Sequence, residues 1–310
     1  MTESILVTGS SGFIGTALAE RLLDAGYCVT GVDQRPNPWS ERIDERTEQL
    51  DLLGDDLSAV DGAFDVLVHL AANSRVGSAV RNPTEATENG RLTRTALEFA
   101  RTRGVEHVLF ASSREVYGLG PQVIYEESNA DPRDCANPYG ASKLFGEALC
   151  EAYRNCYDIQ TSALRFTNVY GRYDRHDRVV PLFIAQALAG EQLAVYGEEK
   201  VIDFVYLDDC VDAVKRAVER RSQIAGEAIN VGSGVGTALV HLADRISERI
   251  DRCPGYEVRS TQTGEPTKTI ADTDKARALL EYAPTYDFDD GLDATIEWYR
   301  NHPEVVESLA

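Results

Sequence analysis

Lysine is scarce in this sequence. Five lysines stand among 31 basic residues, against 51 aspartates and glutamates, so the 310-residue chain has a formal net charge of −20. A surface of this charge repels nucleic acid and anionic lipid headgroups, which excludes nonspecific binding to either. Any phosphate ligand must then rely on local positive sites. Little lysine with dense carboxylate is also typical of a surface solvated in concentrated salt, so a halophilic source is our hypothesis and an ordinary acidic protein is the alternative.

Signals for export, membrane insertion and metal binding are missing as well. Met1 leads almost directly into the apolar run 5–8, without a charged leader or a small-residue cleavage site, and no apolar run is long enough to cross a membrane. The six cysteines are scattered, with no CxxC pair and no neighbouring histidine cluster, so we expect neither disulfides nor a metal. The sequence predicts a cytoplasmic protein with reduced cysteines.

The first half of the chain alternates short apolar runs with stretches of helical length and period. The runs predict strands at residues 5–8, 27–33, 49–52, 66–71, 108–112 and 162–166. Because parallel neighbours need a covering crossover, this alternation predicts an α/β fold with a doubly wound, Rossmann-type parallel sheet. The run 66–71 is apolar on both faces, as a sheet between two helical layers requires.

Beyond residue 168 the alternation loosens. The pattern predicts helices at 179–190 and 205–220, a strand at 228–231, and a loop at 254–270 placed to lie over a ligand. We expect residues 1–168 to form a nucleotide-binding Rossmann domain to which 204–232 returns. Residues 169–203 and 233–310 would then form a smaller, mixed α/β domain that binds the substrate.

A glycine-rich turn follows the first predicted strand and opens a helix. Its candidate phosphate-binding residues are Gly9, Ser11, Gly12, Phe13, Ile14 and Gly15. The glycines fall where the backbone must turn tightly, approach a phosphate and pack on the sheet, and the helix N-terminus presents free N–H groups to an anion. Asp33 ends the next strand eighteen residues after Gly15, the expected distance for a carboxylate that binds the adenosine ribose. Asp33 favours NAD over NADP, although Arg35 nearby would favour the extra phosphate.

A second motif places a phenol and an ammonium one helical turn apart. Tyr139 and Lys143 share one face of a helix that begins after Pro138. The Lys143 charge and a positive nicotinamide ring would lower the pKa of Tyr139 from about 10 towards neutrality, which makes the phenol a usable base. Ser112 and Ser113 end a strand at the carboxyl edge of the sheet, so Ser113 can meet Tyr139 across a substrate.

Together these motifs resemble those of the extended short-chain dehydrogenase/reductases, and within them the sugar-nucleotide epimerases and dehydratases. The similarity spans nearly the whole chain and rests on residues 8–15, 33, 51–52, 69–72, 112–118, 139–143, 165–171 and 203–209. It implies NAD as cofactor and a nucleotide sugar as substrate. It also implies a UDP-glucose 4-epimerase type of reaction, in which Tyr139 takes the proton of the C4 hydroxyl, C4 gives its hydride to NAD and Ser113 holds the oxygen.

The resemblance also assigns further residues. On the cofactor side it implies Asp51, Leu52, Leu70, Ala71, Ala72, Asn89 and Phe166, together with Tyr139 and Lys143. On the substrate side it implies Asn168 at the diphosphate, and Val179, Val180 and Tyr196 at the nucleobase.

Two departures from the family pattern bear on the reaction and the substrate. Dehydratases of this family carry an acidic pair after the hydroxyl residue, whereas this chain has Arg114 and Glu115, which favours an epimerase. Glu115 remains a candidate catalytic residue, or a structural one. The family's two diphosphate-binding arginines are replaced by Ile202 and Gln262. Candidate substitutes are Lys200, Arg172, Arg178, Arg259 and Lys268.

Several activities therefore stay open. A dehydratase or decarboxylase would use Glu115 and change the mass of the sugar. A dehydrogenase of a sugar or uronate without a nucleotide would release NADH, and the missing arginines would permit it. A non-catalytic NAD sensor is the fourth possibility, which the Ser113, Tyr139 and Lys143 set opposes.

The helix around 139–157 has more apolar surface than one face against a sheet needs, through residues such as Leu144, Phe145, Leu149 and Tyr153. Burial within one chain would also explain this stripe. By resemblance, family members pair through the helices at 89–103 and 139–157, so we expect a homodimer.

The composition predicts dependence of stability on salt. If the acidic surface is an adaptation to concentrated salt, the melting temperature should be highest in molar KCl and fall as salt is withdrawn. A melting curve that is unchanged without added salt would contradict the halophilic hypothesis.

Overall fold

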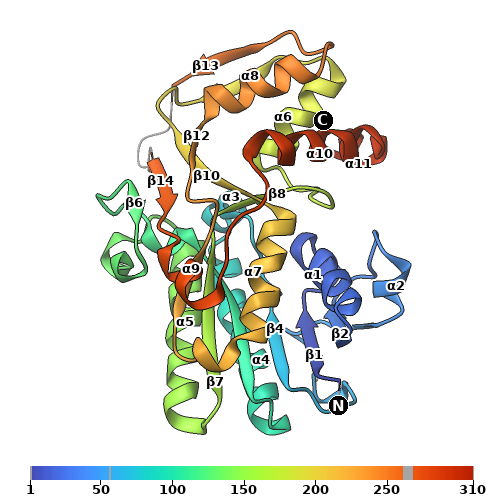
Figure 1. The fold of residues 1–310 in the computed structure, drawn as a ribbon, viewed down its shortest axis with the longest axis vertical. Helices are drawn as coiled ribbons and strands as arrows, with labels where there is room; N and C mark the ends of the chain where they lie inside the picture. The colour runs from blue at the N-terminus through green and yellow to red at the C-terminus, as the bar shows by residue number, and fades with distance from the viewer. Residues whose placement is uncertain (1, 56, 261–267, 310) are drawn as a thin grey trace.

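The computed structural model describes residues 2–55, 57–260 and 268–309 and is built around a parallel seven-stranded sheet (Figure 1). The strand order is β11-β7-β5-β4-β1-β2-β3. The strands are β1 (Ser4–Thr8), β2 (Cys28–Asp33), β3 (Thr47–Gln49), β4 (Val66–His69), β5 (His107–Ser113), β7 (Gln160–Phe166) and β11 (Ala228–Val231). The order reverses direction at β1, which is the switch point where doubly wound sheets bind ligands.

Helices cover both faces of this sheet because successive side chains of each strand point to opposite faces. Ile5 and Val7 of β1 pack in a core with α1 (Phe13–Asp24) and α7 (Leu207–Glu219). Leu6 packs in the opposite core, with α4 (Thr84–Arg103) and α5 (Pro138–Tyr157) beside it. Between these elements lie the short helices α2 (Glu41–Asp44) and α3 (Val76–Arg81).

The remaining chain builds a smaller, mixed part above the carboxyl ends of the strands (Figure 1). Its strands are β6 (Ile124–Tyr125), β8 (Asn168–Tyr170), β9 (Leu193–Tyr196), β10 (Val201–Tyr206), β12 (Gly236–Ala238), β13 (Tyr256–Arg259) and β14 (Lys268–Ala271). Its helices are α6 (Val179–Ala189), α8 (Leu239–Arg249), α10 (Phe288–Arg300) and α11 (Pro303–Leu309), while α9 (Asp274–Leu280) packs beside α7 and β11. A separate apolar core joins α6, α8 and α10, so this part has its own packing.

Several predicted boundaries are wrong. The strand expected at 66–71 ends at His69, and three further differences lie where tertiary pairing decides the structure. The strand expected at 49–52 is β3, which pairs with β2 and ends at Gln49. The helix expected from 205 begins at Leu207, because Val205 and Tyr206 complete β10 beside β8. The loop expected at 254–270 contains β13, paired with β9, and the start of β14, paired with β10 and β6. Residues 261–267 lie outside the described part.

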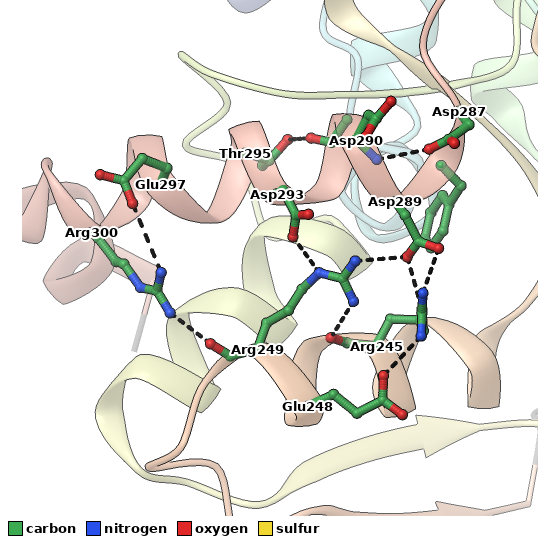
Figure 2. A network of polar contacts seen from close by, with 12 residues as sticks. Arg245, Glu248, Arg249, Asp287, Asp289, Asp290, Asp293, Thr295, Glu297 and Arg300 are labelled. Carbon is green, nitrogen blue, oxygen red and sulfur yellow. Dashed lines mark hydrogen bonds and ion pairs between the residues drawn. The ribbon is translucent and has the colours of Figure 1, made fainter.

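An ion-pair network fastens α8 to the acidic helix α10 (Figure 2). Arg245 and Arg249 both bind Asp289, at 2.5 and 2.8 Å, and Arg249 also binds Asp293. Arg300 closes the network with a 2.6 Å bond to the carbonyl oxygen of Arg249. Single exposed ion pairs contribute little to the free energy of folding. A shared network in which Arg249 is largely buried holds the two helices in register.

In the described residues no helix is long and apolar enough to cross a membrane.

Candidate functional site

A cleft runs along the carboxyl ends of the central strands, between the sheet and the smaller part. Each strand supplies a lining residue at or just past its end: Gly9 after β1, Asp33 on β2, Leu70 after β4, Ser113 on β5 and Phe166 on β7. The opposite wall comes from β8, β10 and the start of α6.

The glycine-rich turn has a backbone that only glycine allows. Gly9 has a φ of +79°, and a Cβ placed there would lie 2.8 Å from the backbone nitrogen of Ala71. A Cβ on Gly15 would lie 2.0 Å from the carbonyl oxygen of Gly9. Helix α1 begins at Phe13, and its N-cap, Gly12, has no side chain to bind the first N–H groups. The turn therefore holds the positive end of α1 open towards the cleft.

Two polar groups beside this turn fit a dinucleotide. Asp33 is fixed by the backbone N–H groups of Ser11, at 3.1 Å, and Arg35, at 3.0 Å, and burial raises its pKa despite these bonds. The Ser11 hydroxyl oxygen is buried and has no partner within the described residues. A buried hydroxyl needs a partner. A phosphate at the α1 N-terminus would supply one, so the residues present fit the group that the sequence predicts.

The reactive side chains meet where α5 crosses β5. Tyr139, Lys143 and Ser113 are all buried, and all three line the cleft. The ammonium of Lys143 donates to the carbonyl oxygen of Ala111 at 2.8 Å and lies 5.6 Å from the centre of the Tyr139 ring. Burial lowers the pKa of Lys143 to about 8. These contacts place the phenol, the ammonium and the Ser113 hydroxyl around one point.

The polypeptide alone does not lower the pKa of Tyr139, and the lowering by Lys143 together with a bound nicotinamide ring stays a prediction. Burial raises the pKa of Tyr139 to about 12, and the charge of Arg178 and a hydrogen bond from Ser113 oppose that rise only in part. Sequence spacing identified the neighbouring ammonium but not the depth of burial. The polypeptide alone therefore keeps this phenol protonated at neutral pH, and any further lowering has to come from a bound positive charge.

Glu115 is held on two sides. Arg114 binds one carboxylate oxygen at 2.8 Å, and Asn137 donates to the other at 2.7 Å. Asn137 also caps α5, since its side-chain oxygen accepts from the backbone N–H of Gly140 at 2.9 Å. Glu115 lines the cleft, but its carboxylate anchors the start of the helix that carries Tyr139.

The structure separates the five candidate phosphate-binding cations. Arg178 and Lys200 line the cleft, as does Ile202. Arg172 is paired with Asp208 at 2.8 Å, outside the cleft lining. Arg259 binds the Tyr196 hydroxyl and Glu257 at the surface, and Lys268 is exposed. Gln262 lies outside the described residues.

Most of the other sequence-predicted site residues also line the cleft: Gly12, Phe13, Ile14, Gly15, Asp51, Leu52, Ala71, Ala72, Asn168, Val179 and Val180. Three do not. Ser11 is a buried residue of the turn whose backbone N–H donates to Asp33, and Tyr196 is half exposed on β9. Asn89 is buried behind the wall, where it bonds the backbone of Asn73 at 2.7 and 3.0 Å.

The sequence identified Arg178 as a candidate phosphate-binding cation but gave no role to the residues around it in the cleft. His176, Asp177 and Arg178 line the cleft opposite Ser74 and Arg75, which follow β4. The position of Ser74 and Arg75, directly after the matched segment 69–72, was a usable signal. The course of residues 172–178 was not, because it depends on contacts between distant parts of the chain.

Comparison with known proteins identifies the same family that the sequence motifs resemble. Residues 5–232 match the model of the NAD dependent epimerase/dehydratase family. The UDP-glucose 4-epimerase of Mycolicibacterium smegmatis is 34% identical, over 96% of this chain and 98% of its own. The UDP-N-acetyl-alpha-D-glucosaminuronate decarboxylase of Bacillus cytotoxicus is 30% identical, over 97% and 98%. The structure of UDP-glucuronic acid 4-epimerase from Bacillus cereus, with UDP-glucuronic acid and NAD, has a TM-score of 0.88 at 30% identity and covers 96% of this chain and 99% of its own.

The turn geometry predicts a sharp difference between two glycines. Gly15→Ala should lower NAD affinity by more than about tenfold, because the new Cβ cannot fit against the Gly9 carbonyl and displaces the phosphate-facing N–H groups. Gly54→Ala is the matched control, since a Cβ there meets no atom within 4 Å. Calorimetric titration with NAD measures both. Equal affinities in the two variants would refute the role given to the turn.

Proposed function

The chain belongs to the NAD-dependent epimerase/dehydratase family, with NAD as its cofactor, and we propose that it is a 4-epimerase of UDP-glucose or a related UDP-sugar. The observation that carries this proposal is the cluster of Ser113, Tyr139 and Lys143 at the cleft, next to a Glu115 already held by Arg114 and Asn137. The relatives support it, because they include epimerases of UDP-glucose and of UDP-glucuronic acid.

In the proposed reaction the chain moves a proton at the C4 oxygen of the sugar. NAD, when bound, supplies the means to oxidise C4 and then reduce it again. Tyr139 would take the C4 hydroxyl proton and later return it, and Ser113 would hold the same oxygen through its hydroxyl. Lys143 would steady the Tyr139 phenolate with its charge, from the position that its bond to Ala111 fixes. After oxidation the 4-keto sugar rotates within the site, so that its other face is presented for reduction, and this reduction gives the C4 epimer.

The contacts of Glu115 favour epimerisation over loss of water. A dehydratase needs an acid that delivers a proton to the leaving hydroxyl. Glu115 faces the Arg114 guanidinium at 2.8 Å and accepts a bond from Asn137, so both its oxygens are already engaged. Turning this carboxylate towards a sugar would break its bond to the Asn137 amide, whose oxygen caps α5, the helix that carries Tyr139.

A decarboxylase of a UDP-uronate is the second candidate. It uses the same oxidation at C4, after which the C5–C6 bond breaks, carbon dioxide leaves and the resulting enolate takes a proton at C5 from solvent or a protein acid before C4 is reduced. A relative that is 30% identical, named as a UDP-N-acetyl-alpha-D-glucosaminuronate decarboxylase, supports it. The Arg114 side chain, which lines the cleft beside Asn168 and Thr269, would give a uronate carboxylate a cationic neighbour.

We also propose that the protein works as a homodimer through α4 and α5. These helices pack against each other over a long contact. On α5 the large side chains of Phe145 and Tyr157 are each about half exposed. Phe145 lies against Gly90 of α4, where a Cβ would come within 2.7 Å of its ring. An apolar surface shared by two parallel helices suits burial against a second copy of the same pair.

The epimerase proposal makes a prediction about mass and redox balance. UDP-glucose or UDP-glucuronic acid should be converted to a C4 epimer of equal mass, without net NADH in the solution. Tyr139→Phe should slow turnover by about 10²- to 10⁴-fold, because the proton at the C4 oxygen loses its acceptor. Tyr157→Phe, an exposed tyrosine on the same helix, is the control and should keep full activity. Mass spectrometry measures the mass of the product, and the absorbance of NADH measures any net reduction of NAD. A lighter product would favour decarboxylation or dehydration, and NADH release would favour a dehydrogenase.

The dimer proposal predicts that one exposed side chain controls assembly. Phe145→Glu should convert a dimer to a monomer, because a charge would have to be buried in the apolar contact. Val258→Glu, which changes an exposed apolar residue on β13, should leave the dimer intact. Light scattering measures the mass of each variant. A monomeric parent protein would end the proposal.

A further inference from the structure

One short segment crosses from the smaller part of the molecule to the glycine-rich turn. Residues 172–178 leave β8 and lead into α6, and Tyr173 adopts a φ of +71°, which is strained for a side chain of this size. Its ring stacks on Trp39 at 5.6 Å and meets Trp298 of α10 edge-on at 5.9 Å. Its hydroxyl donates to Glu20 of α1 at 3.3 Å. The segment is thus tied to the loop after β2, to α1 and to α10.

A buried carboxylate fixes the inner side of this segment. Asp174 has no exposed surface, and it binds the His176 ring at 2.9 Å and the Arg178 guanidinium at 3.3 Å. Its backbone oxygen accepts a bond from the Tyr299 hydroxyl of α10. Burial raises the pKa of Asp174, but the Arg178 charge and the bonds from His176 outweigh this and hold the pKa below its usual range. Asp174 therefore stays charged and aims Arg178 towards the cleft.

Arg178 ends over the start of α1. Its guanidinium donates to the Ser74 hydroxyl at 3.2 Å and lies 5.8 Å from the centre of the Phe13 ring. Phe13 is the first residue of α1, whose open N-terminus faces the cleft. The side chain remains 36% exposed, so the guanidinium keeps N–H groups that can turn towards a ligand.

Other cations of the cleft have different positions. Arg75 faces Asp177 at 3.7 Å, and Arg114 faces Glu115. Lys143 is buried and donates to the carbonyl oxygen of Ala111, and Arg35 lies in the loop after β2, where its backbone N–H donates to Asp33. The Arg178 guanidinium, by contrast, lies over the ring of Phe13, the first residue of α1.

We propose that Arg178 binds the pyrophosphate of NAD, as a cation that the smaller part of the molecule lays over the glycine-rich turn. A planar guanidinium suits paired phosphate oxygens, and the turn itself offers backbone N–H groups and the Ser11 hydroxyl but no positively charged side chain. The diphosphate would then be held from both parts of the chain, in a protein whose net charge repels it. This inference depends on NAD binding at the turn, and not on the epimerisation proposed above.

The test measures binding without turnover. Calorimetry would give the dissociation constants of NAD and of UDP, as a probe for the substrate diphosphate, for the parent protein, Arg178→Met and Arg178→Lys. We expect the dissociation constant of NAD to rise roughly tenfold to a hundredfold in Arg178→Met and less in Arg178→Lys, because one charge-assisted pair is lost or weakened. The affinity for UDP should not change. Arg42→Met, which removes the same charge from an exposed pair with Asp24, is the control and should bind NAD normally.

Two results would overturn the inference. Arg178→Met that binds NAD as tightly as the parent protein would leave Arg178 a structural residue. Loss of UDP affinity with NAD affinity intact would make it a ligand of the substrate diphosphate instead. Melting curves identify a variant that fails to fold, and in that case Arg178→Lys decides, since it keeps the charge but not the planar fork. If the parent protein fails to epimerise a UDP-sugar while Arg178→Met still binds NAD more weakly than the parent, the result counts against the proposed function alone.

Discussion

The close approach of backbone to backbone at the glycine-rich turn is the constraint on which the site depends. The carbonyl of Gly9 lies where a Cβ of Gly15 would be, and Gly9 itself lies against Ala71 after β4. This contact sets the direction of α1, and so the place of any bound phosphate. The N–H of Ser11 in the same turn fixes Asp33 at the end of β2. One turn therefore joins the open N-terminus of α1, the Asp33 carboxylate at the end of β2 and the segment after β4.

Charge is the second constraint, because a chain of formal charge −20 has to hold NAD and, in the proposed function, an anionic UDP-sugar as well. Its cations are directed by carboxylates: Asp174 aims Arg178, and Glu115 holds Arg114. Away from the cleft, charge serves packing, as where Arg249 ties α8 to Asp289 and Asp293 of α10. The positive groups that matter for binding are thus few and individually fixed, which suits a surface that otherwise repels phosphate.

The cofactor half of the fold could be predicted from the sequence because its signals are local. The turn, Asp33 and the Tyr139 to Lys143 spacing each lie within one strand or helix, and the structure brings them to one cleft. What could not be predicted depends on contacts between distant segments. The deep burial of Tyr139, which raises its pKa in the polypeptide alone, and the contacts of Glu115 with Arg114 and Asn137 could be known only from the coordinates. The same holds for β13 and β14, short strands that exist through their partners.

The central claim is that this site oxidises and reduces the same sugar carbon while Tyr139 moves the proton of its oxygen. A UDP-hexose carrying deuterium at C4 tests this most directly. If the claim holds, the epimer formed by the purified protein retains its deuterium at C4, as read by mass spectrometry and NMR, even in ordinary water. Loss of the label to solvent, or its appearance at another carbon, would contradict it.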